Sequence, residues 1–119
     1  MRGKRTHHDL QVWQESIQLV KEIYVTTATF PASETYGLTN QMRRSAISVP
    51  SNIAEGAARG SKKEFLQFLT IARGSLSELE TQVILAKEFG FIKNDHSLHS
   101  KIESVFGLLG GLINSLRKS

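Results

Sequence analysis

Apolar residues recur at alternating steps of four and three along most of the chain, and this spacing places them on one face of an α-helix. The clearest stripe lies between Lys62 and Phe89 and consists of Phe65, Leu69, Ala72, Leu76, Leu79, Val83 and Ala86. Ser61 and Glu64 form a capping box at its start, in which each side chain can satisfy a free backbone N–H, and Gly90 supplies a stop. A helix is therefore predicted over residues 62–89.

Two further segments repeat this pattern at the ends of the chain. Asp9 is expected to cap the first, which should end near Thr29 because Pro31 disfavours helix in the residue before it. Asn94 or Asp95 is expected to cap the last. Their apolar positions are Leu10, Trp13, Ile17, Val20 and Tyr24 in the first segment and Leu98, Ile102, Val105, Leu109, Leu112 and Leu116 in the last.

A fourth segment, residues 36–57, has helical spacing but a more polar seam. Its inward positions are Leu38, Met42, Ser45 or Ala46, Val49 and Ile53. Pro50 removes one backbone hydrogen bond, so a kink or a break is expected between Ala46 and Pro50. Gly56 and Gly60 are expected to end this helix and to open the turn to the next one.

Four amphipathic helices joined by short loops predict an all-α protein, an antiparallel up-and-down four-helix bundle. No stretch shows the sustained two-residue alternation of a β-strand, and 119 residues suit one hydrophobic core. The expected organisation is a flexible basic tail over residues 1–8 and a bundle domain over residues 9–119. No run approaches the roughly 20 apolar residues of a membrane-spanning helix, and cysteine is absent, so a cytoplasmic protein without membrane contact is expected.

Charge adds a candidate surface to this architecture. The net charge of +4 is weak evidence alone, but the stretch from Tyr36 to Ser75 holds six cationic side chains and only two acidic ones. The six are Arg43, Arg44, Arg59, Lys62, Lys63 and Arg73, and a separate basic tail contains Arg2, Lys4 and Arg5. Such a layout suits contact with a phosphate backbone, which needs positive charge and little base-specific geometry. No aromatic stacking platform or helix-turn-helix signature accompanies it, so a solvated basic rim is the alternative.

Catalytic and metal-binding constellations are not expected. His96, His99 and Glu103 lie at the start of the last helix, but no second cluster offers further ligands, so surface histidines are the better interpretation. The helical serines have no histidine within predictable reach, and the glycines form no phosphate loop. The sequence therefore predicts a protein that is not an enzyme, with no catalytic residue, metal or cofactor.

Polar and small residues along the two middle helices indicate specific contacts. Glu78 and Glu80 should diverge because they are two apart, and one of them is expected to face Arg43 or Arg44. Gly74 costs a helix about 1 kcal/mol relative to alanine, so a neighbouring helix or another subunit is expected close to its backbone. The inward polar positions Ser45, Ser48, Asn52 and Ser75 favour subunit contacts or a buried hydrogen-bonded seam.

Several runs in the chain match a known family. They are Leu10-Gln-Val-Trp13, Pro31 with Glu34, Tyr36-Gly-Leu38, Gln41-Met-Arg-Arg-Ser45, Ser48-Val-Pro-Ser-Asn-Ile-Ala-Glu-Gly56 with Arg59, Glu64-Phe65, Phe68-Leu69 and Ala72-Arg-Gly-Ser-Leu-Ser-Glu-Leu-Glu80. From Asp9 to Ile92 the chain resembles the small bacterial four-helix-bundle proteins called 23S rRNA-intervening sequence proteins. It is also similar to the accessory variability determinant proteins of retroelements. The resemblance implies a left-handed bundle, a homopentamer, and contact with nucleic acid and a reverse transcriptase through a basic surface.

Two interpretations of function remain open. In the first, a non-enzymatic oligomer binds RNA or DNA backbone through the six cationic residues, and repetition of the patch strengthens a weak contact by multivalency. In the second, the protein is a structural or protein-interaction scaffold without a nucleic-acid ligand. The second interpretation places Glu55, Glu64, Glu78 and Glu80 within ion-pair reach of the arginines.

Overall fold

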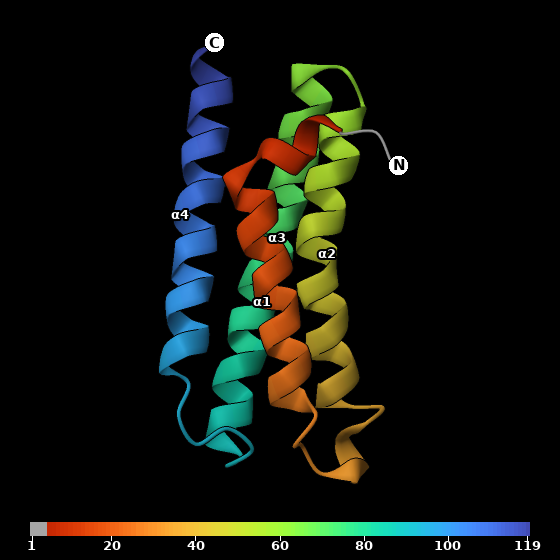
Figure 1. The fold of residues 1–119 in the computed structure, drawn as a ribbon, viewed down its shortest axis with the longest axis vertical. Helices are drawn as coiled ribbons and strands as arrows, with labels where there is room; N and C mark the ends of the chain where they lie inside the picture. The colour runs from red at the N-terminus through yellow and green to blue at the C-terminus, as the bar shows by residue number, and fades with distance from the viewer. Residues whose placement is uncertain (1–4) are drawn as a thin grey trace.

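The computed structural model describes residues 5–119, and its four long helices form an antiparallel up-and-down bundle (Figure 1). The helices are α1 (Gln11–Thr27), α2 (Leu38–Ala58), α3 (Lys62–Glu88) and α4 (His96–Lys118). Two short 3-10 helices, η1 (Thr6–Asp9) and η2 (Ala32–Glu34), precede α1 and α2. No strand occurs among residues 5–119, so the predicted all-α class is confirmed.

The expected basic tail falls partly outside this range. Arg2 and Lys4 lie outside the described residues, whereas Thr6–Asp9 at the other end of the segment form η1. This 3-10 helix contacts both α1 and α2.

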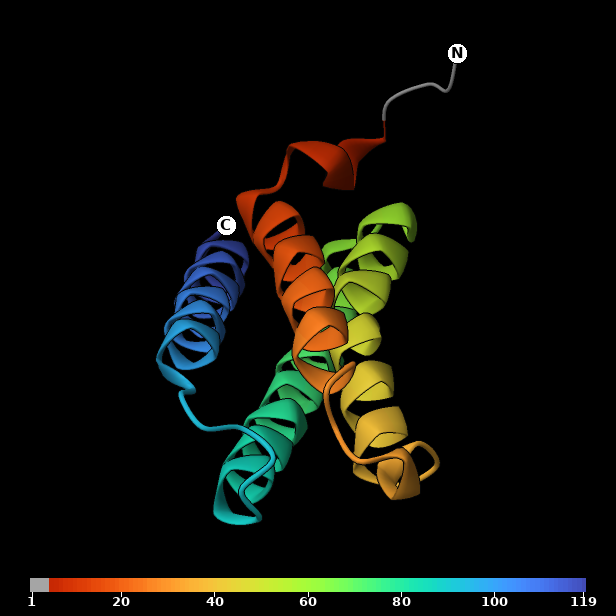
Figure 2. The same cartoon turned by 60° about the horizontal axis from the view of Figure 1, so that its bottom comes forward.

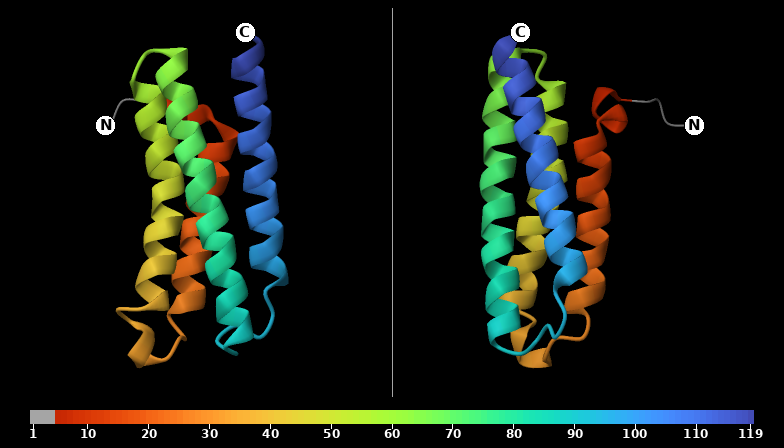
Figure 3. Two further views of the ribbon diagram at one scale, coloured as in Figure 1. Left: turned by 180° about the vertical axis from the view of Figure 1, so that it is seen from behind. Right: turned by 90° about the vertical axis from the view of Figure 1, so that its left-hand side faces the viewer.

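Each long helix packs against two neighbours, which arranges the four at the corners of a square (Figures 2 and 3). α1 and α3 occupy opposite corners, and each of them contacts both α2 and α4. The most extensive contact joins α2 to α3. The stripes predicted for α2 and α3 line the centre, as does that of α4 except that Ile113 is buried where Leu112 was expected. The largest fully buried side chains are Leu19, Ile23, Met42, Ile53, Leu69, Leu76, Leu79, Ile102, Leu109, Ile113, Val49 and Val105.

The stripe predicted for α1 is wrong: Leu10, Trp13, Ile17 and Val20 are half-buried and Tyr24 is exposed, whereas the buried face consists of Val12, Ser16, Leu19, Ile23 and Thr27. Apolar residues occupy two adjacent faces of α1, so their spacing does not select the inward one.

Both predicted ends of α3 are confirmed. The hydroxyl oxygen of Ser61 accepts a hydrogen bond from the backbone N–H of Glu64 at 3.2 Å, and that hydroxyl donates to the Glu64 carboxylate at 3.1 Å. The carboxylate therefore engages the Ser61 side chain, where a full capping box would have it reach the backbone. At the other end Gly90 has a φ of 81°, and Phe91 N–H donates to the carbonyl oxygen of Ala86 at 2.9 Å, which closes a Schellman motif.

The capping residue predicted for α1 is wrong, whereas one of the two predicted for α4 is confirmed. Asp9 does not cap α1, because it is the last residue of η1 and the helix begins at Gln11 without a side-chain cap. At α4 the carboxamide oxygen of Asn94 accepts a hydrogen bond from His96 N–H at 3.0 Å. Of the two proposed caps, Asn94 therefore supplies the hydrogen bond and Asp95 does not.

Pro50 lies inside α2 and does not break it. The helix continues from Leu38 to Ala58 (Figure 1), so of the expected kink or break between Ala46 and Pro50 the break does not occur. Pro50 is buried together with its neighbour Val49, and most helical stability in a protein comes from tertiary packing of this kind. The loss of one hydrogen bond is therefore tolerated.

The two glycines near the end of α2 have different roles. Gly60 has a φ of 81° and opens the turn to α3, as predicted. Gly56, by contrast, does not end the helix and is buried within it. A β-carbon at Gly56 would lie 2.7 Å from Cβ of Phe68 and 3.0 Å from a ring carbon of Phe65, so only glycine allows α2 to approach α3 this closely.

Candidate nucleic-acid interface

The six predicted cationic residues are distributed along α2 and α3 and do not form one compact patch. Arg59, Lys62 and Lys63 lie at the turn between α2 and α3, at the end of the bundle where the chain also terminates (Figure 1). Arg43, Arg44 and Arg73 lie within the helices. Three of the six side chains contact other residues of the chain and three do not, so the two groups are described separately.

Arg43 ties α2 to α1. Its Nε donates a hydrogen bond to Oγ1 of Thr27 at 2.9 Å, and a guanidinium nitrogen donates to the carbonyl oxygen of Tyr24 at 3.4 Å. The guanidinium also lies 4.4 Å from the centroid of the Tyr24 ring, a cation–π contact. Arg43 is therefore a structural side chain, and its charge is directed at α1.

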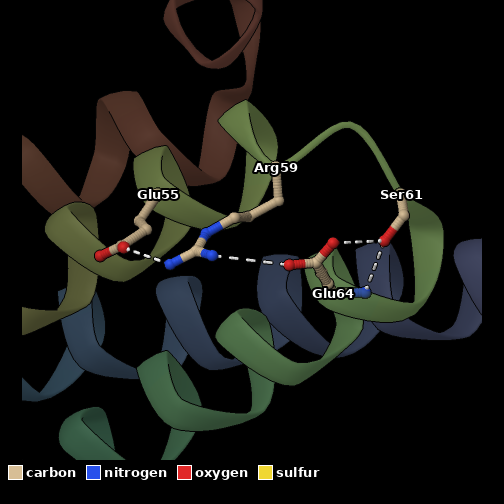
Figure 4. Close-up of polar contacts among 4 residues, drawn as sticks. All are labelled: Glu55, Arg59, Ser61 and Glu64. Atoms are coloured by element: carbon tan, nitrogen blue, oxygen red, sulfur yellow. Dashed lines mark hydrogen bonds and ion pairs between the residues drawn. The ribbon is translucent and has the colours of Figure 1, made fainter.

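Arg59 is held by two carboxylates at the α2–α3 turn (Figure 4). Its guanidinium lies 2.8 Å from Oε2 of Glu55 and 3.6 Å from Oε2 of Glu64, and it stacks 5.0 Å from the centroid of Phe68. These side chains are close to half exposed, so the ion pairs contribute little stability, but they compensate the charge. For Glu55 and Glu64 this is the pairing expected of the scaffold interpretation.

Lys62 contacts the end of α4. Its ammonium donates to the carbonyl oxygen of Ser119 and lies 3.4 Å from the hydroxyl of the same residue. Next to it lies a surface hollow of about 750 Å³ with a cationic rim, lined by Lys62, Lys63, Leu66, Gln67, Phe68, Thr70, Ile71 and Arg117. This end of the bundle therefore combines apolar floor and positive charge.

The other three cationic residues have no such partners. Within residues 5–119, Arg44, Lys63 and Arg73 make no hydrogen bond, ion pair or cation–π contact. Arg44 and Lys63 are exposed and Arg73 is half-buried. Their charges are therefore the ones available to an anionic ligand.

A polar seam runs along the α2–α3 contact. The hydroxyls of Ser48 and Ser75 lie 2.8 Å apart, Asn52 donates to the hydroxyl of Ser48 at 2.9 Å, and Ser45 donates to a carboxylate oxygen of Glu78 at 3.3 Å. This is the hydrogen-bonded seam that the inward polar positions predicted. It borders a groove of about 320 Å³ lined by Gln41, Arg44, Ser45, Ser48, Ser75, Glu78 and Gln82, in which Oε1 of the buried Gln82 has no partner.

The expected pairing of Glu78 or Glu80 with Arg43 or Arg44 is wrong for the described residues. Glu78 accepts from Ser45 and Arg43 contacts α1, which leaves neither arginine in an ion pair. The carboxylate of Glu80 lies near two side chains of α4. Spacing along one helix indicates which residues face inward but not which neighbouring helix they contact. The partners of Glu78 and Glu80 therefore could not be predicted from the sequence.

The two histidines of η1 pack on the first turn of α1. The rings of His7 and His8 lie 5.0 Å and 5.3 Å from the ring of Trp13, centroid to centroid. Burial lowers the pKa of the His7 imidazole, and the charges of His8 and Arg5 lower it further. These contacts hold η1 beside the α2–α3 turn, with which Thr6 shares a small hollow.

Comparison with known proteins adds one finding to this geometry. A family model described as 23S rRNA-intervening sequence protein matches residues 8–111. No curated protein matches the chain. Among residues 5–119, no helix has the length and apolar character needed to cross a membrane.

Proposed function

The chain belongs to the 23S rRNA-intervening sequence protein family, and from this premise we propose that it is a cytoplasmic, non-enzymatic oligomer that binds the backbone of RNA or DNA. The observation that carries the proposal is the set of cations without an internal partner, Arg44, Lys63 and Arg73. A cation that is already paired inside the chain loses that pairing when it binds a phosphate. These three cations have no internal partner to lose. They are therefore the proposed contacts, with Arg43, Arg59 and Lys62 in structural roles.

Self-association is the second part of the proposal. Gly74 has open space around it within 4 Å, so no helix of its own chain explains why glycine stands there. Ile71 and Leu85 are 50% and 41% exposed and lie on the same outer face of α3 as Gly74, at helical spacing. A second copy packed over this face would bury the apolar side chains and approach the backbone at Gly74. The proposed assembly is the homopentamer that the family resemblance implies.

The nucleic-acid contact is tested by binding a labelled structured RNA across a salt series. A triple variant, Arg44→Ala, Lys63→Ala and Arg73→Ala, should bind at least tenfold more weakly and reduce the slope of log affinity against log salt by roughly two to three per chain. Arg59→Ala is the matched control, because it removes a cation that Glu55 and Glu64 already compensate. Affinity that does not change with salt, or no binding at low salt, would refute the proposal.

A scaffold without a nucleic-acid ligand is the second candidate, and the internal pairing of Arg43, Arg59 and Lys62 favours it. The two candidates predict the same oligomer but different contents after purification. Light scattering measures the number of subunits, and the ratio of absorbance at two ultraviolet wavelengths detects nucleic acid that copurifies. An oligomer that carries none and binds none would establish the scaffold.

A further inference from the structure

The bundle end remote from the α2–α3 turn holds a cluster that the nucleic-acid proposal does not use. Here the C-terminal half of α3 lies beside the first turns of α4 (Figure 3). Glu80 of α3 and His99 and Glu103 of α4 each present one ligand atom, and these atoms all lie within 4.8 Å of one another. The cluster therefore combines an imidazole nitrogen with carboxylate oxygens from two helices.

We propose that Glu80, His99 and Glu103 bind a divalent transition-metal ion of the Zn²⁺ type. One nitrogen and two oxygen donors suit Zn²⁺, which is often held by three protein ligands with a fourth position open. His99 and Glu103 are one helical turn apart and share a face of α4. Glu80 supplies a third ligand from a second helix, and this ligand was not predicted from the sequence. A rotamer adjustment of these exposed or half-buried side chains would bring the three atoms within coordination distance of one ion.

The surroundings of the cluster favour cation binding. Within residues 5–119, none of the three side chains makes a hydrogen bond or an ion pair. By contrast, Asp95 nearby pairs with Lys87 at 3.2 Å, and one carboxylate oxygen of Glu22 accepts a hydrogen bond from Ser97 at 2.7 Å. Two carboxylates that converge repel each other, and a bound cation removes that repulsion.

A metal ion at this position would join α3 to α4 close to the connection between them. The remaining contacts between these helices are largely apolar, so the ion would add a directional link near their ends. Binding to the folded chain and not to the unfolded chain raises the melting temperature. Zinc binding is expected without nucleic acid, because none of Glu80, His99 and Glu103 belongs to the proposed contacts Arg44, Lys63 and Arg73.

Calorimetric titration of the full chain with ZnCl₂ tests the proposal, together with thermal unfolding in the presence of zinc. One Zn²⁺ per chain is expected, with a melting temperature raised by roughly 5 °C at about ten times the dissociation constant. Glu80→Gln, His99→Ala and Glu103→Gln should each weaken binding at least tenfold. Two controls should bind like the wild type: His96→Ala, one turn before His99, and the double variant His7→Ala with His8→Ala.

Three outcomes would overturn the site. Unchanged affinity in His99→Ala or Glu80→Gln would show that zinc binds elsewhere. Loss in His96→Ala with retention in Glu80→Gln would place the ion on α4 alone. One ion per two chains, with a doubled mass in light scattering, would show a bridge between copies. Unfolding of each variant without zinc checks that the fold is intact, and Glu103→Gln serves if His99→Ala is destabilised.

Discussion

Helix α3 meets its two neighbours with different chemistry. On the α2 side, Ser48, Ser75 and Glu78 belong to a hydrogen-bonded seam, and Gly56 lets the two backbones come close. On the α4 side the contact is aliphatic, with Ile102 and Leu109 among the fully buried side chains. No hydrogen bond joins α3 to α4 between their ends within residues 5–119.

The difference indicates how the two contacts are specified. Hydrogen bonds are directional and fix the register of two helices, whereas apolar burial is roughly proportional to area and tolerates small shifts. We therefore regard α2 and α3 as a hairpin of defined geometry and α4 as a helix held by its buried apolar face. Substitutions on the two sides of α3 should then differ in size and in sign.

The largest effect is expected on the α4 side. Leu109→Ala removes a fully buried side chain and leaves a cavity, so it should lower the free energy of unfolding by about 2–5 kcal/mol. Urea denaturation followed by circular dichroism measures this. The half-buried Leu112 on the same helix is the matched control, and Leu112→Ala should cost clearly less. Equal losses at the two positions would contradict the view that one buried stripe holds α4.

A smaller loss is expected at the close approach of α2 and α3. Gly56→Ala gains helix propensity but places a β-carbon against Cβ of Phe68, so a net loss of about 1–3 kcal/mol is expected. Gly111 of α4 has open space within 4 Å, and Gly111→Ala should stabilise the protein by about 0.5–1 kcal/mol. Urea denaturation measures both changes. If Gly56→Ala and Gly111→Ala changed the free energy of unfolding in the same direction, the contrast between α2 and α4 would be contradicted.

The seam itself should contribute less than either packing change. A double-mutant cycle with Ser48→Ala and Ser75→Ala should give a coupling energy of about 0.5–1.5 kcal/mol, the usual net value of a hydrogen bond. Unfolding of the two single variants and the double variant supplies the cycle. A coupling near zero would mean that the 2.8 Å contact between the hydroxyls adds nothing to the α2–α3 register.

The smallest effect on the single chain is expected at Gly74. Because nothing lies within 4 Å of this position, Gly74→Ala should raise the stability of the isolated chain by about 0.5–1 kcal/mol, as Gly111→Ala does. If a second copy packs against this face, however, the added methyl group should weaken assembly, which light scattering across a dilution series measures. Unchanged subunit number at all concentrations would remove Gly74 from the proposed contact between copies.

Local signals in the sequence were sufficient for the elements of the fold and insufficient for its contacts. The four-and-three spacing identified the inward faces of α2, α3 and α4, and Ser61 and Gly90 marked the ends of α3, because these signals act within one or two turns. In α1 the same spacing selected the face of Trp13 and Val20, whereas Val12, Leu19 and Ile23 are buried. Both faces of α1 are apolar, and only the neighbouring helices decide which one turns inward.

Gly56 was misread as a helix end, since its role depends on Phe68 across the interface. The contacts of Arg43, Glu78 and Glu80 were also predicted wrongly. The spacing of residues shows which face of a helix is inward, but it does not show which helix packs against that face.

An even number of antiparallel helices returns the chain to the end where it entered, and this decides how the molecule can be handled. Ser119 contacts Lys62, so immobilisation through the C-terminus would turn the cationic end towards the support and obstruct it. Tyr36, 93% exposed, lies in the connection at the opposite end. The chain has no cysteine, so Tyr36→Cys would give a single thiol for attaching a fluorophore at the end of the bundle opposite Lys63.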